Sequence, residues 1–338
     1  MKILITGGAG FIGCNAARRL IEGGHEVIIV DNLSRRGTET NLQWLKGIGR
    51  FDFHKADVRD QEALEQIARS HPDLDAIFHF AAQVAVTTSF EDPIHDFEVN
   101  LRGTLNLLEI ARGMEKPPFF LYTSTNKVYG DLEEYEIVED AKRYRFKSIE
   151  AIGESQPLDF HSPYGCSKGG ADQYVLDYAR YLGLPSCVFR MSCIYGPRQF
   201  GIEDQGWVAW FMIAAIKNRP ITIYGTGKQV RDVLYIDDLV DAFLLALEKP
   251  DKSGGQAFNV GGGPRNTWSL LELIEFIEEK LGKKIELKFD TMRPGDQRIY
   301  ISDISKIKGT LGWQPKVDAR DGATRLLDWI RSNPDIFP

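Results

Sequence analysis

The stretch TGGAGFIG, from Thr6 to Gly13, gives the strongest indication of how this chain folds. An apolar run, KILIT, precedes it, and a pattern of helical period follows it near 12–23. Its glycines form both GxGxxG and GxxGxxG. Such glycines permit a tight strand-to-helix turn and let backbone N–H groups approach a pyrophosphate, which the helix dipole also favours. The stretch therefore predicts a dinucleotide site. The alternative is a glycine-rich turn that binds nothing.

An acidic residue, Asp31, ends the next apolar run, EVIIV, about 20 residues after the glycines. Its carboxylate would accept hydrogen bonds from the adenosine ribose hydroxyls and would repel a 2′-phosphate. This favours NAD over NADP as the cofactor, although Arg35 and Arg36 nearby weaken the preference. Asp57, after the third strand, is placed to lie on the adenine side. A role as a helix N-cap or turn residue explains it equally well.

Short apolar runs alternate with segments of helical period along the first half of the chain. The runs KILIT, EVIIV, FDFHKA, DAIFHFAA and PFFLYTS predict strands, and helices are predicted near 12–23, 60–70, 97–113 and 164–182. This alternation is typical of right-handed βαβ units, so we predict an α/β fold with a Rossmann-type doubly wound parallel sheet.

The pattern becomes less regular after Arg190, where a smaller α/β substrate-binding C-terminal domain is expected. The predicted division is an NAD-binding domain over 1–190, to which 233–260 returns, and a substrate-binding domain over 191–232 and 261–338. The segment 131–160 is long, charged and weakly periodic. Such segments are often lids or binding loops, and a solvated surface insertion is the alternative.

Composition limits the kinds of partner. The 338 residues are 43% hydrophobic and 26% charged, with a formal net charge of −7 and no long Lys/Arg run. We therefore expect a soluble globular protein that binds neither nucleic acid nor a membrane surface. The scattered cysteines, at 14, 166, 187 and 193, predict neither a metal site nor disulfides. Because no cleavable apolar segment precedes the first strand, we expect no signal peptide and a cytoplasmic location.

The pentapeptide YGCSK places Tyr164 and Lys168 four residues apart, on one face of the predicted helix. A tyrosine titrates near pH 10, and an ammonium close by favours the phenolate. The pair can therefore form a general acid/base that works near pH 7. A second YxxxK, Tyr224–Lys228, encloses Gly-Thr-Gly and predicts a turn. A bland surface helix remains the alternative for the first pair when it is considered alone.

TGGAGFIG, Asp31, YTSTNKVYG and SPYGCSKGGAD, in this order, resemble an extended short-chain dehydrogenase/reductase of the nucleotide-sugar type. The resemblance covers nearly the whole chain. It implies a catalytic triad of Thr125, Tyr164 and Lys168, and a tightly bound NAD that is regenerated in each cycle. The implied cofactor contacts are Gly7, Gly10, Phe11, Ile12, Gly13, Asp31, Asn32, Ser34, Arg35, Asp57, Val58, Phe80, Ala81, Ala82, Gln83, Asn100, Ser124, Tyr164 and Lys168. For Asn100, a buried core amide is an equal explanation.

Motifs of the second half, among them YGPRQF, DQGWV, GKQVRDVLY and RPGDQR, are similar to those of epimerases in this family that act on CDP-sugars. The resemblance implies epimerisation at C2 of a CDP-3,6-dideoxyhexose, and a homodimer or homotetramer. The sequence leaves two alternatives open: a UDP-hexose 4-epimerase, and a non-catalytic dinucleotide sensor on the same fold.

Sugar-nucleotide 4,6-dehydratases of this superfamily carry an acidic pair just before VYG. Here these positions hold Asn126 and Lys127. Because an amide cannot donate a catalytic proton at neutral pH, a dehydratase is disfavoured. Asn126 would hydrogen-bond sugar hydroxyls, and Lys127 would contact the sugar or a phosphate. A polar turn at the end of a strand is the alternative for both.

A phosphate anchor is expected in the second half, since a keto intermediate must turn over without escaping. Arg231 and Arg293 match the family's phosphate positions, and arginine fits phosphate oxygens bidentately. Weaker candidates for sugar or nucleoside contacts are Arg198, Gln199, Gln205 and Tyr224. His161 is interpreted as structural, and the aromatic stripe Trp207, Trp210 and Phe211 as core rather than a ligand platform.

Inversion of a carbinol carbon without an adjacent carbonyl calls for transient oxidation, because no protein base ionises its C–H bond usefully. In this hypothesis Tyr164 takes the hydroxyl proton while NAD takes the hydride, and both are returned after the ketone presents its other face. Thr125 hydrogen-bonds the reacting oxygen. Lys168 holds the nicotinamide ribose and lowers the tyrosine pKa.

Overall fold

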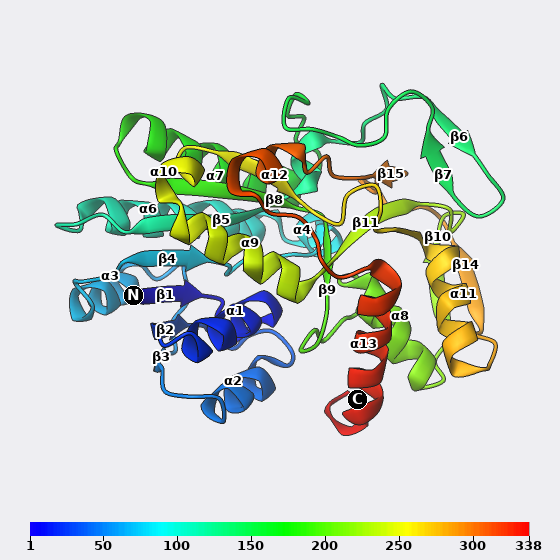
Figure 1. Cartoon of the computed structure of the whole chain (residues 1–338), viewed down its shortest axis with the longest axis horizontal. Helices are drawn as coiled ribbons and strands as arrows, with labels where there is room; N and C mark the ends of the chain where they lie inside the picture. Colours follow the sequence, from blue (N-terminus) through cyan, green and yellow to red (C-terminus); the bar gives the residue numbers. More distant parts are fainter. Residues whose placement is uncertain (338) are drawn as a thin grey trace.

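A seven-stranded parallel sheet forms the centre of the computed structural model, which describes residues 1–337 (Figure 1). Its order is β3, β2, β1, β4, β5, β8, β12, so the chain runs outward in both directions from β1. The strands are β1 (Lys2–Thr6), β2 (Glu26–Val30), β3 (Asp52–His54), β4 (Ala76–His79), β5 (Phe119–Thr125), β8 (Ser186–Met191) and β12 (Ala257–Val260). The predicted Rossmann-type doubly wound fold is confirmed.

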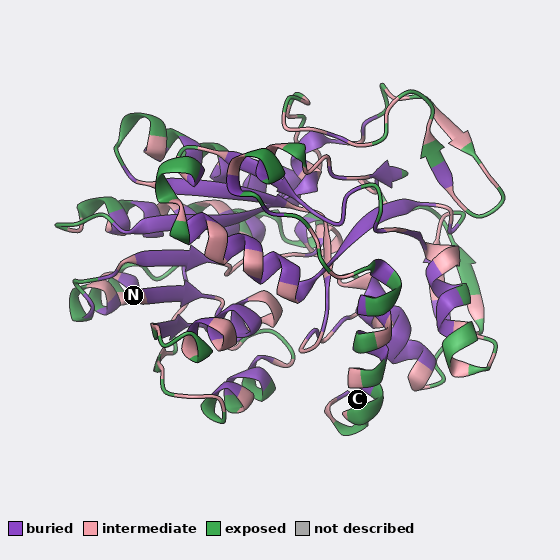
Figure 2. Ribbon diagram, viewed as in Figure 1, coloured by how far each residue is buried: buried purple, intermediate pink, exposed green. Residues whose placement is uncertain are grey.

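Helices cover both faces of the sheet. One layer contains α1 (Phe11–Glu22), α2 (Thr38–Lys46) and α9 (Ile236–Glu248); the other contains α3 (Gln61–Ser70), α6 (Gly103–Gly113) and α7 (Ser162–Tyr181). Side chains alternate between them: Ile3 and Ile5 face the first layer, and Leu4 faces the second. Because both faces are buried, the strands read as continuous apolar runs (Figure 2).

Short helical pieces connect β4 to α6: α4 (Val86–Glu91), α5 (Pro93–Phe97) and η1 (Glu98–Arg102). The helix predicted near 97–113 is therefore not a regular α-helix at its start, because η1 is a turn of π-helix and contains Asn100. Such turns occur mostly as single bulges, often at functional sites.

Most of the remaining elements lie beside the carboxyl edge of the sheet (Figure 1). The strands β9 (Cys193–Tyr195), β11 (Val230–Tyr235), β13 (Thr267–Ser269) and β15 (Ile299–Tyr300) form one small sheet, and β10 (Ile221–Tyr224) pairs with β14 (Leu287–Asp290). The helices are α8 (Trp207–Ile216), α10 (Pro250–Ser253), α11 (Leu270–Leu281), α12 (Ser305–Leu311) and α13 (Ala319–Ser332), and η3 (Pro334–Ile336) follows. The segment 233–260 contributes α9 and β12 to the main sheet layer, while the division into two domains stays a prediction.

The segment 131–160 packs against the C-terminal strands. It contains a hairpin of β6 (Ile137–Glu139) and β7 (Tyr144–Phe146). The N–H of Tyr144 donates to the Lys228 carbonyl (2.9 Å), and the N–H of Ile152 donates to the Ile301 carbonyl (2.8 Å). Ile152 is also buried. Among the described residues none of 131–160 lines the cavity described below, so the segment is a packed insertion and not a lid over it.

Candidate active site

The glycine turn between β1 and α1 is built by backbone contacts that leave no room for side chains. A Cβ on Gly7 would lie 2.7 Å from the Ala81 nitrogen, and a Cβ on Gly13 would lie 2.1 Å from the Gly7 carbonyl oxygen. Gly7 also has φ +67°, which favours glycine. A Cβ on Gly10 would meet only the Gly7 oxygen, at 3.1 Å, so the outer side of the turn is accessible to a ligand.

Two observations test whether NAD fits this turn. The first turn of α1, which Phe11 and Ile12 open, has Gly10 as its N-cap and no side-chain cap, so its N–H groups are available to a pyrophosphate. At the end of β5, the Ser124 hydroxyl is buried without a hydrogen-bond partner. A buried orphan hydroxyl is costly unless a ligand pairs with it. Both features fit a bound dinucleotide.

The carboxylate of Asp31 is almost fully buried and braces the turn. It accepts from the Ala9 N–H (3.0 Å) and from the Leu33 N–H (2.8 Å). Burial raises its pKa, and these backbone donors oppose the rise. Asn32 and Ser34 continue the loop at the surface, and the Ser34 N–H donates to the Asn32 side chain (3.0 Å). The loop thus presents a carboxylate and polar groups, as expected for a ribose site.

The contacts of Asp57 support a role as a turn residue more than a role on the adenine side of the cofactor. Its carboxylate accepts from the Arg59 side chain (2.9 Å), from the Arg59 N–H (3.0 Å) and from the Asn32 amide (2.8 Å). The Arg59 guanidinium lowers the pKa of Asp57 well below its usual range. Its neighbour Val58 is buried in the core against Gly103.

The segment after β4 is held by a buried polar network. Asn100 accepts from the Gln83 N–H (2.9 Å) and donates to the Ser167 hydroxyl (3.1 Å), while the Gln83 amide donates to Asp96 (2.7 Å). Asn100 is therefore a satisfied core amide that positions this segment against α7. At the start of this segment, Phe80 stacks on Phe243. The next residues are Ala81 and Ala82, and the backbone of Ala81 lies against Gly7 of the glycine turn.

Thr125, at the end of β5, lies next to Tyr164, in the first turn of α7. Burial raises the pKa of Tyr164 to about 12, and a hydrogen bond with Thr125 opposes this rise. Lys168 is buried one turn later, where its Nζ donates to the Thr123 carbonyl (2.6 Å) and lies over the Tyr122 ring. Burial lowers its pKa to about 7, while Asp96 and Asp172 oppose this. The sequence predicted a lowered pKa for Tyr164. In the chain by itself the pKa is raised instead, because the effect of burial exceeds the effects that lower it.

A cavity of about 280 Å³ opens from Thr125 and Tyr164 toward β10 and α8. Most of the predicted substrate residues line it: Thr125, Asn126, Lys127, Gln205, Tyr224, Arg231 and Arg293. Gln205 also accepts a hydrogen bond from Arg35 (3.4 Å), which links it to the cofactor loop. The cavity is thus bounded by the end of β5, by α8 and by the loop before β15.

Arg198 and Gln199 do not line the cavity, so the structure does not place them as predicted. Arg198 has φ +72°, and its guanidinium lies over the Trp44 ring, 4.2 Å from the centroid. The Gln199 amide is buried and donates to the Ile194 carbonyl (3.2 Å). The turn therefore directs both side chains into packing.

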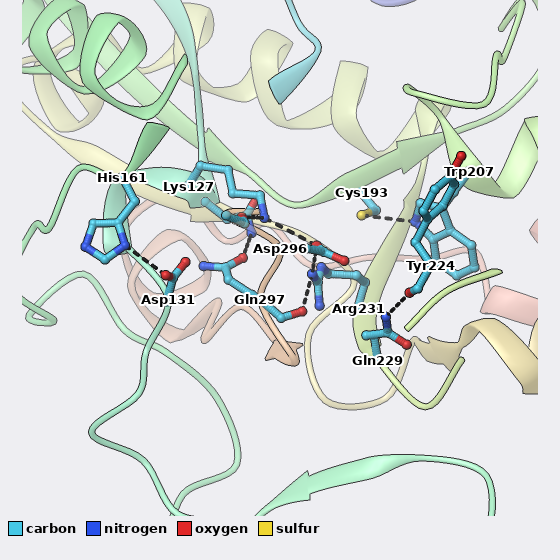
Figure 3. Close-up of polar contacts among 12 residues, drawn as sticks. Lys127, Asp131, His161, Cys193, Trp207, Tyr224, Gln229, Arg231, Asp296 and Gln297 are labelled. Atoms are coloured by element: carbon cyan, nitrogen blue, oxygen red, sulfur yellow. Dashed lines mark hydrogen bonds and ion pairs between the residues drawn. The ribbon is translucent and has the colours of Figure 1, made fainter. Parts of the chain in front are cut away.

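A run of polar contacts joins the two walls of the cavity (Figure 3). The Lys127 Nζ donates to the Gly295 carbonyl (3.0 Å) and pairs with Asp296 (3.5 Å), which accepts from Arg231 (2.6 Å). The Asn126 amide donates to the Gln297 side chain (2.8 Å). The Asn-Lys pair that begins the 3₁₀ turn η2 (Asn126–Tyr129) therefore holds the loop before β15.

Arg293 lies at the other end of the cavity. Its guanidinium stacks on the Tyr224 ring, 3.8 Å from the centroid, and pairs with Asp204 (3.0 Å). The Tyr224 hydroxyl donates to Glu203 (2.9 Å). Glu203 and Asp204 were not predicted, since nothing in the sequence separates them from other surface acids.

The aromatic stripe on α8 belongs to the hydrophobic core and also faces the cavity. Its interpretation as core alone was therefore incomplete. Trp207, Trp210 and Phe211 pack on the hydrophobic core and also line the cavity. The Trp207 indole donates to the Cys193 sulfur (3.3 Å), another cavity residue. Further lining residues that the sequence did not indicate include Thr222, Gln229, Leu270 and Asp296.

His161 lies outside the cavity, as the structural interpretation expected. Its ring contacts Asp131 (2.9 Å) and Asp159 (2.9 Å), and the hydrogen bond to Asp131 raises its pKa. Among residues 1–337, no group of three or more His, Cys, Asp or Glu side chains could hold a metal ion. Within the same range, no helix is both long and apolar enough to cross a membrane.

A Rossmann sheet, a glycine turn, and a Tyr-Lys pair on the helix after β5 define an extended short-chain dehydrogenase/reductase. Residues 4–326 match the family described as GDP-mannose 4,6 dehydratase, and the chain belongs to this family. The resemblance drawn from the sequence motifs is thereby confirmed.

Curated and solved relatives are similar along the full length. The chain is 47% identical over 340 residues to CDP-paratose 2-epimerase of Salmonella typhi, covering 98% of this chain and 100% of that protein. The UDP-glucose 4-epimerase of Thermotoga maritima, solved with UDP-glucose, superposes with a TM-score of 0.85 at 34% identity, covering 99% and 100% of the two chains. The Thermus thermophilus UDP-glucose 4-epimerase, solved with NAD, has a TM-score of 0.83 at 34% identity, covering 98% and 99%.

Proposed function

We propose that this protein is an NAD-dependent epimerase that inverts C2 of the sugar in a CDP-3,6-dideoxyhexose through a transient keto-sugar. The observation that carries the proposal is that Thr125 and Tyr164 line one cavity together with Arg231 and Arg293. The 47% identity to CDP-paratose 2-epimerase supports the choice of substrate.

NAD, when bound, would accept a hydride from the carbinol carbon and return it to the opposite face. Tyr164 takes the hydroxyl proton and later gives it back, and Thr125 donates a hydrogen bond to the reacting oxygen or accepts one from it. A phenol whose pKa is raised to about 12 is mostly protonated at neutral pH. Its phenolate therefore depends on nearby positive charge: Arg35 lowers the pKa of Tyr164, and Lys168, in the next turn of α7, would add to this effect when it is protonated.

The residues beside Thr125 are unsuited to elimination. Asn126 cannot serve as an acid, and Asp296, the carboxylate that Lys127 contacts, is paired with both Arg231 and Lys127. Although burial opposes it, these two cations lower the pKa of Asp296. A carboxyl group with a lowered pKa is ionised at neutral pH and cannot protonate a leaving hydroxyl. This supports an epimerase over a dehydratase.

The lining residues suggest an order for the parts of the substrate. The sugar would lie at Thr125 and Tyr164, and the pyrophosphate would be held by the arginines. The nucleoside would reach Tyr224 and the aromatic stripe of α8, since an apolar wall suits a base. A fixed pyrophosphate lets the keto-sugar turn over without leaving the cavity.

Purified protein incubated with CDP-, UDP- and dTDP-sugars in D₂O, without added cofactor, tests the proposal. We expect an epimerised CDP-sugar without solvent deuterium at the inverted carbon, because the hydride is returned internally. Deuterium at that carbon would refute the hydride mechanism. Acid treatment of the purified protein should also release NAD, as expected for a tightly bound cofactor.

A UDP-hexose 4-epimerase is the second candidate, since both solved relatives described above are UDP-glucose 4-epimerases. Activity confined to UDP-glucose or UDP-galactose would favour it. A dinucleotide sensor would need neither Tyr164 nor Thr125 at a cavity, and both are present. A protein that binds NAD but converts none of these sugars would favour the sensor.

We also propose that the protein forms a homodimer through α4, α5 and α7. Phe90, Ile94, Phe97 and Tyr174 are exposed on these neighbouring helices, and Ile94 is 71% exposed. Such an apolar patch is typical of an interface. Light scattering should show a dimer that Ile94→Asp converts to a monomer, while Phe289→Asp, on the separate strand β14, should leave the dimer intact. A monomeric wild-type protein would exclude this interface.

A further inference from the structure

Lys127 occupies a distinctive place in the cavity. It lies two residues after Thr125, and its backbone N–H donates to the Thr125 hydroxyl oxygen (3.2 Å). Its side chain is mostly buried, 17% exposed, and lines the cavity together with Tyr164. The ammonium group therefore lies inside the site and belongs to the wall that carries the reacting end.

The protein does not use all of the hydrogen-bonding capacity of this ammonium. Lys127 has three N–H donors. One donates to the Gly295 carbonyl (3.0 Å), and Asp296 is an ion-pair partner at 3.5 Å. At least one donor is left for a ligand in the cavity.

The charges around Lys127 favour an anion. Lys127 and Arg231 share the single carboxylate of Asp296, so the group of three carries one excess positive charge. Arg231 also donates to the carbonyls of Val230 and Gln297, which fixes its guanidinium (Figure 3). An excess charge in a largely buried cluster is costly unless an anionic ligand balances it.

We propose that Lys127 binds the phosphate group attached to C1 of the sugar. The inference rests on the proposed function and specifies which carbon reacts. In a hexose, C2 is bonded to the C1 that bears the phosphate, whereas C4 lies across the ring. A cation two residues after the catalytic Thr125, lining the same cavity, can reach this phosphate when C2 is the reacting carbon. In a 4-epimerase, the ring would separate the two groups.

The competing explanation is that Lys127 only fixes the loop before β15, through Gly295 and Asp296. If Lys127 only fixes this loop, its substitution would weaken the binding of every ligand of the cavity to the same extent. A phosphate contact would affect only ligands that carry the phosphate next to the sugar. In CDP the terminal phosphate stands in for that group, and CMP lacks it, so these two nucleotides separate the explanations.

The experiment is calorimetric titration of the NAD-containing protein with CDP and with CMP, for wild type, Lys127→Met and Lys127→Gln. Glutamine keeps an N–H donor for the Gly295 carbonyl but removes the charge. Lys228→Met is the matched control, because Lys228 belongs to the other YxxxK match, pairs with Glu139 and does not line the cavity. Thermal melting shows whether each variant is folded.

We expect both Lys127 variants to bind CDP about tenfold or more weakly and CMP unchanged, and Lys228→Met to bind both as wild type does. Equal weakening of CDP and CMP, or no weakening of either, would overturn the proposal. If wild type prefers uridine nucleotides, UDP and UMP replace the cytidine pair. In that case the proposed base is wrong, while the role of Lys127 is still tested.

Discussion

The glycine turn and the substrate cavity are built in opposite ways. In the turn, Gly7 and Gly13 contact backbone atoms closely, and one short stretch supplies nearly everything. The cavity joins the end of β5 to the loop before β15 through side chains such as Asn126 and Gln297, which are 171 residues apart. The turn therefore tolerates few substitutions but is evident in the sequence. The cavity is assembled only by folding.

The largest effect is expected on turnover, from a substitution at Tyr164, where the two regions meet. Tyr164→Phe removes the proton-transfer group and leaves the glycine turn intact. Turnover should fall by about 10²–10⁴-fold, measured by product formation, while acid-released NAD stays at the wild-type level. Turnover close to that of wild type would remove Tyr164 from the mechanism.

Gly13→Ala should break the turn. The added Cβ would lie 2.1 Å from a backbone oxygen, which cannot move as a flexible side chain can. We expect a loss of about 3 kcal/mol or more in the free energy of unfolding, together with loss of bound NAD. Urea unfolding and cofactor release measure these. Gly113→Ala, where a Cβ would meet nothing within 4 Å, is the control and should cause little loss.

Asn126→Ala should weaken the link between the two cavity walls without affecting the turn. It removes the donor to the side-chain amide oxygen of Gln297, which is buried. We expect a loss of about 1–3 kcal/mol in the free energy of unfolding and normal NAD content. Unchanged stability would mean that water or another donor replaces the amide.

Acid should destabilise the protein through His79, which lies beneath the turn between Thr6 and Thr104 (2.7 and 3.0 Å). Burial lowers its pKa to about 3 from an unfolded value of 6.5. Between these values the unfolded chain binds more protons, so stability falls as pH falls. This one residue contributes up to about 1.4 kcal/mol per pH unit. Urea unfolding from pH 7 to pH 4 should show a smaller slope for His79→Gln than for wild type; an equal slope would contradict this assignment.

Sequence reasoning succeeded where the structure is local. The strand, glycine turn and helix around Gly10 and the helix carrying Tyr164 and Lys168 follow from short motifs with a known period. It did not indicate that the Arg198 guanidinium lies over the Trp44 ring and outside the cavity lining. It also missed the cavity role of Trp207, since periodicity shows that a residue is on an apolar face but not what lies opposite.

Short motifs were enough to predict the individual strands and helices, the glycine turn and the candidate catalytic residues, because each of these depends on neighbours within a few residues. The surroundings of these residues follow only from the folded structure. Burial raises the pKa of Tyr164 rather than lowering it. Asp296, from a loop far along the chain, pairs with Lys127 and Arg231. Burial and long-range pairing depend on which segments meet in space, and this information is not contained in any short stretch.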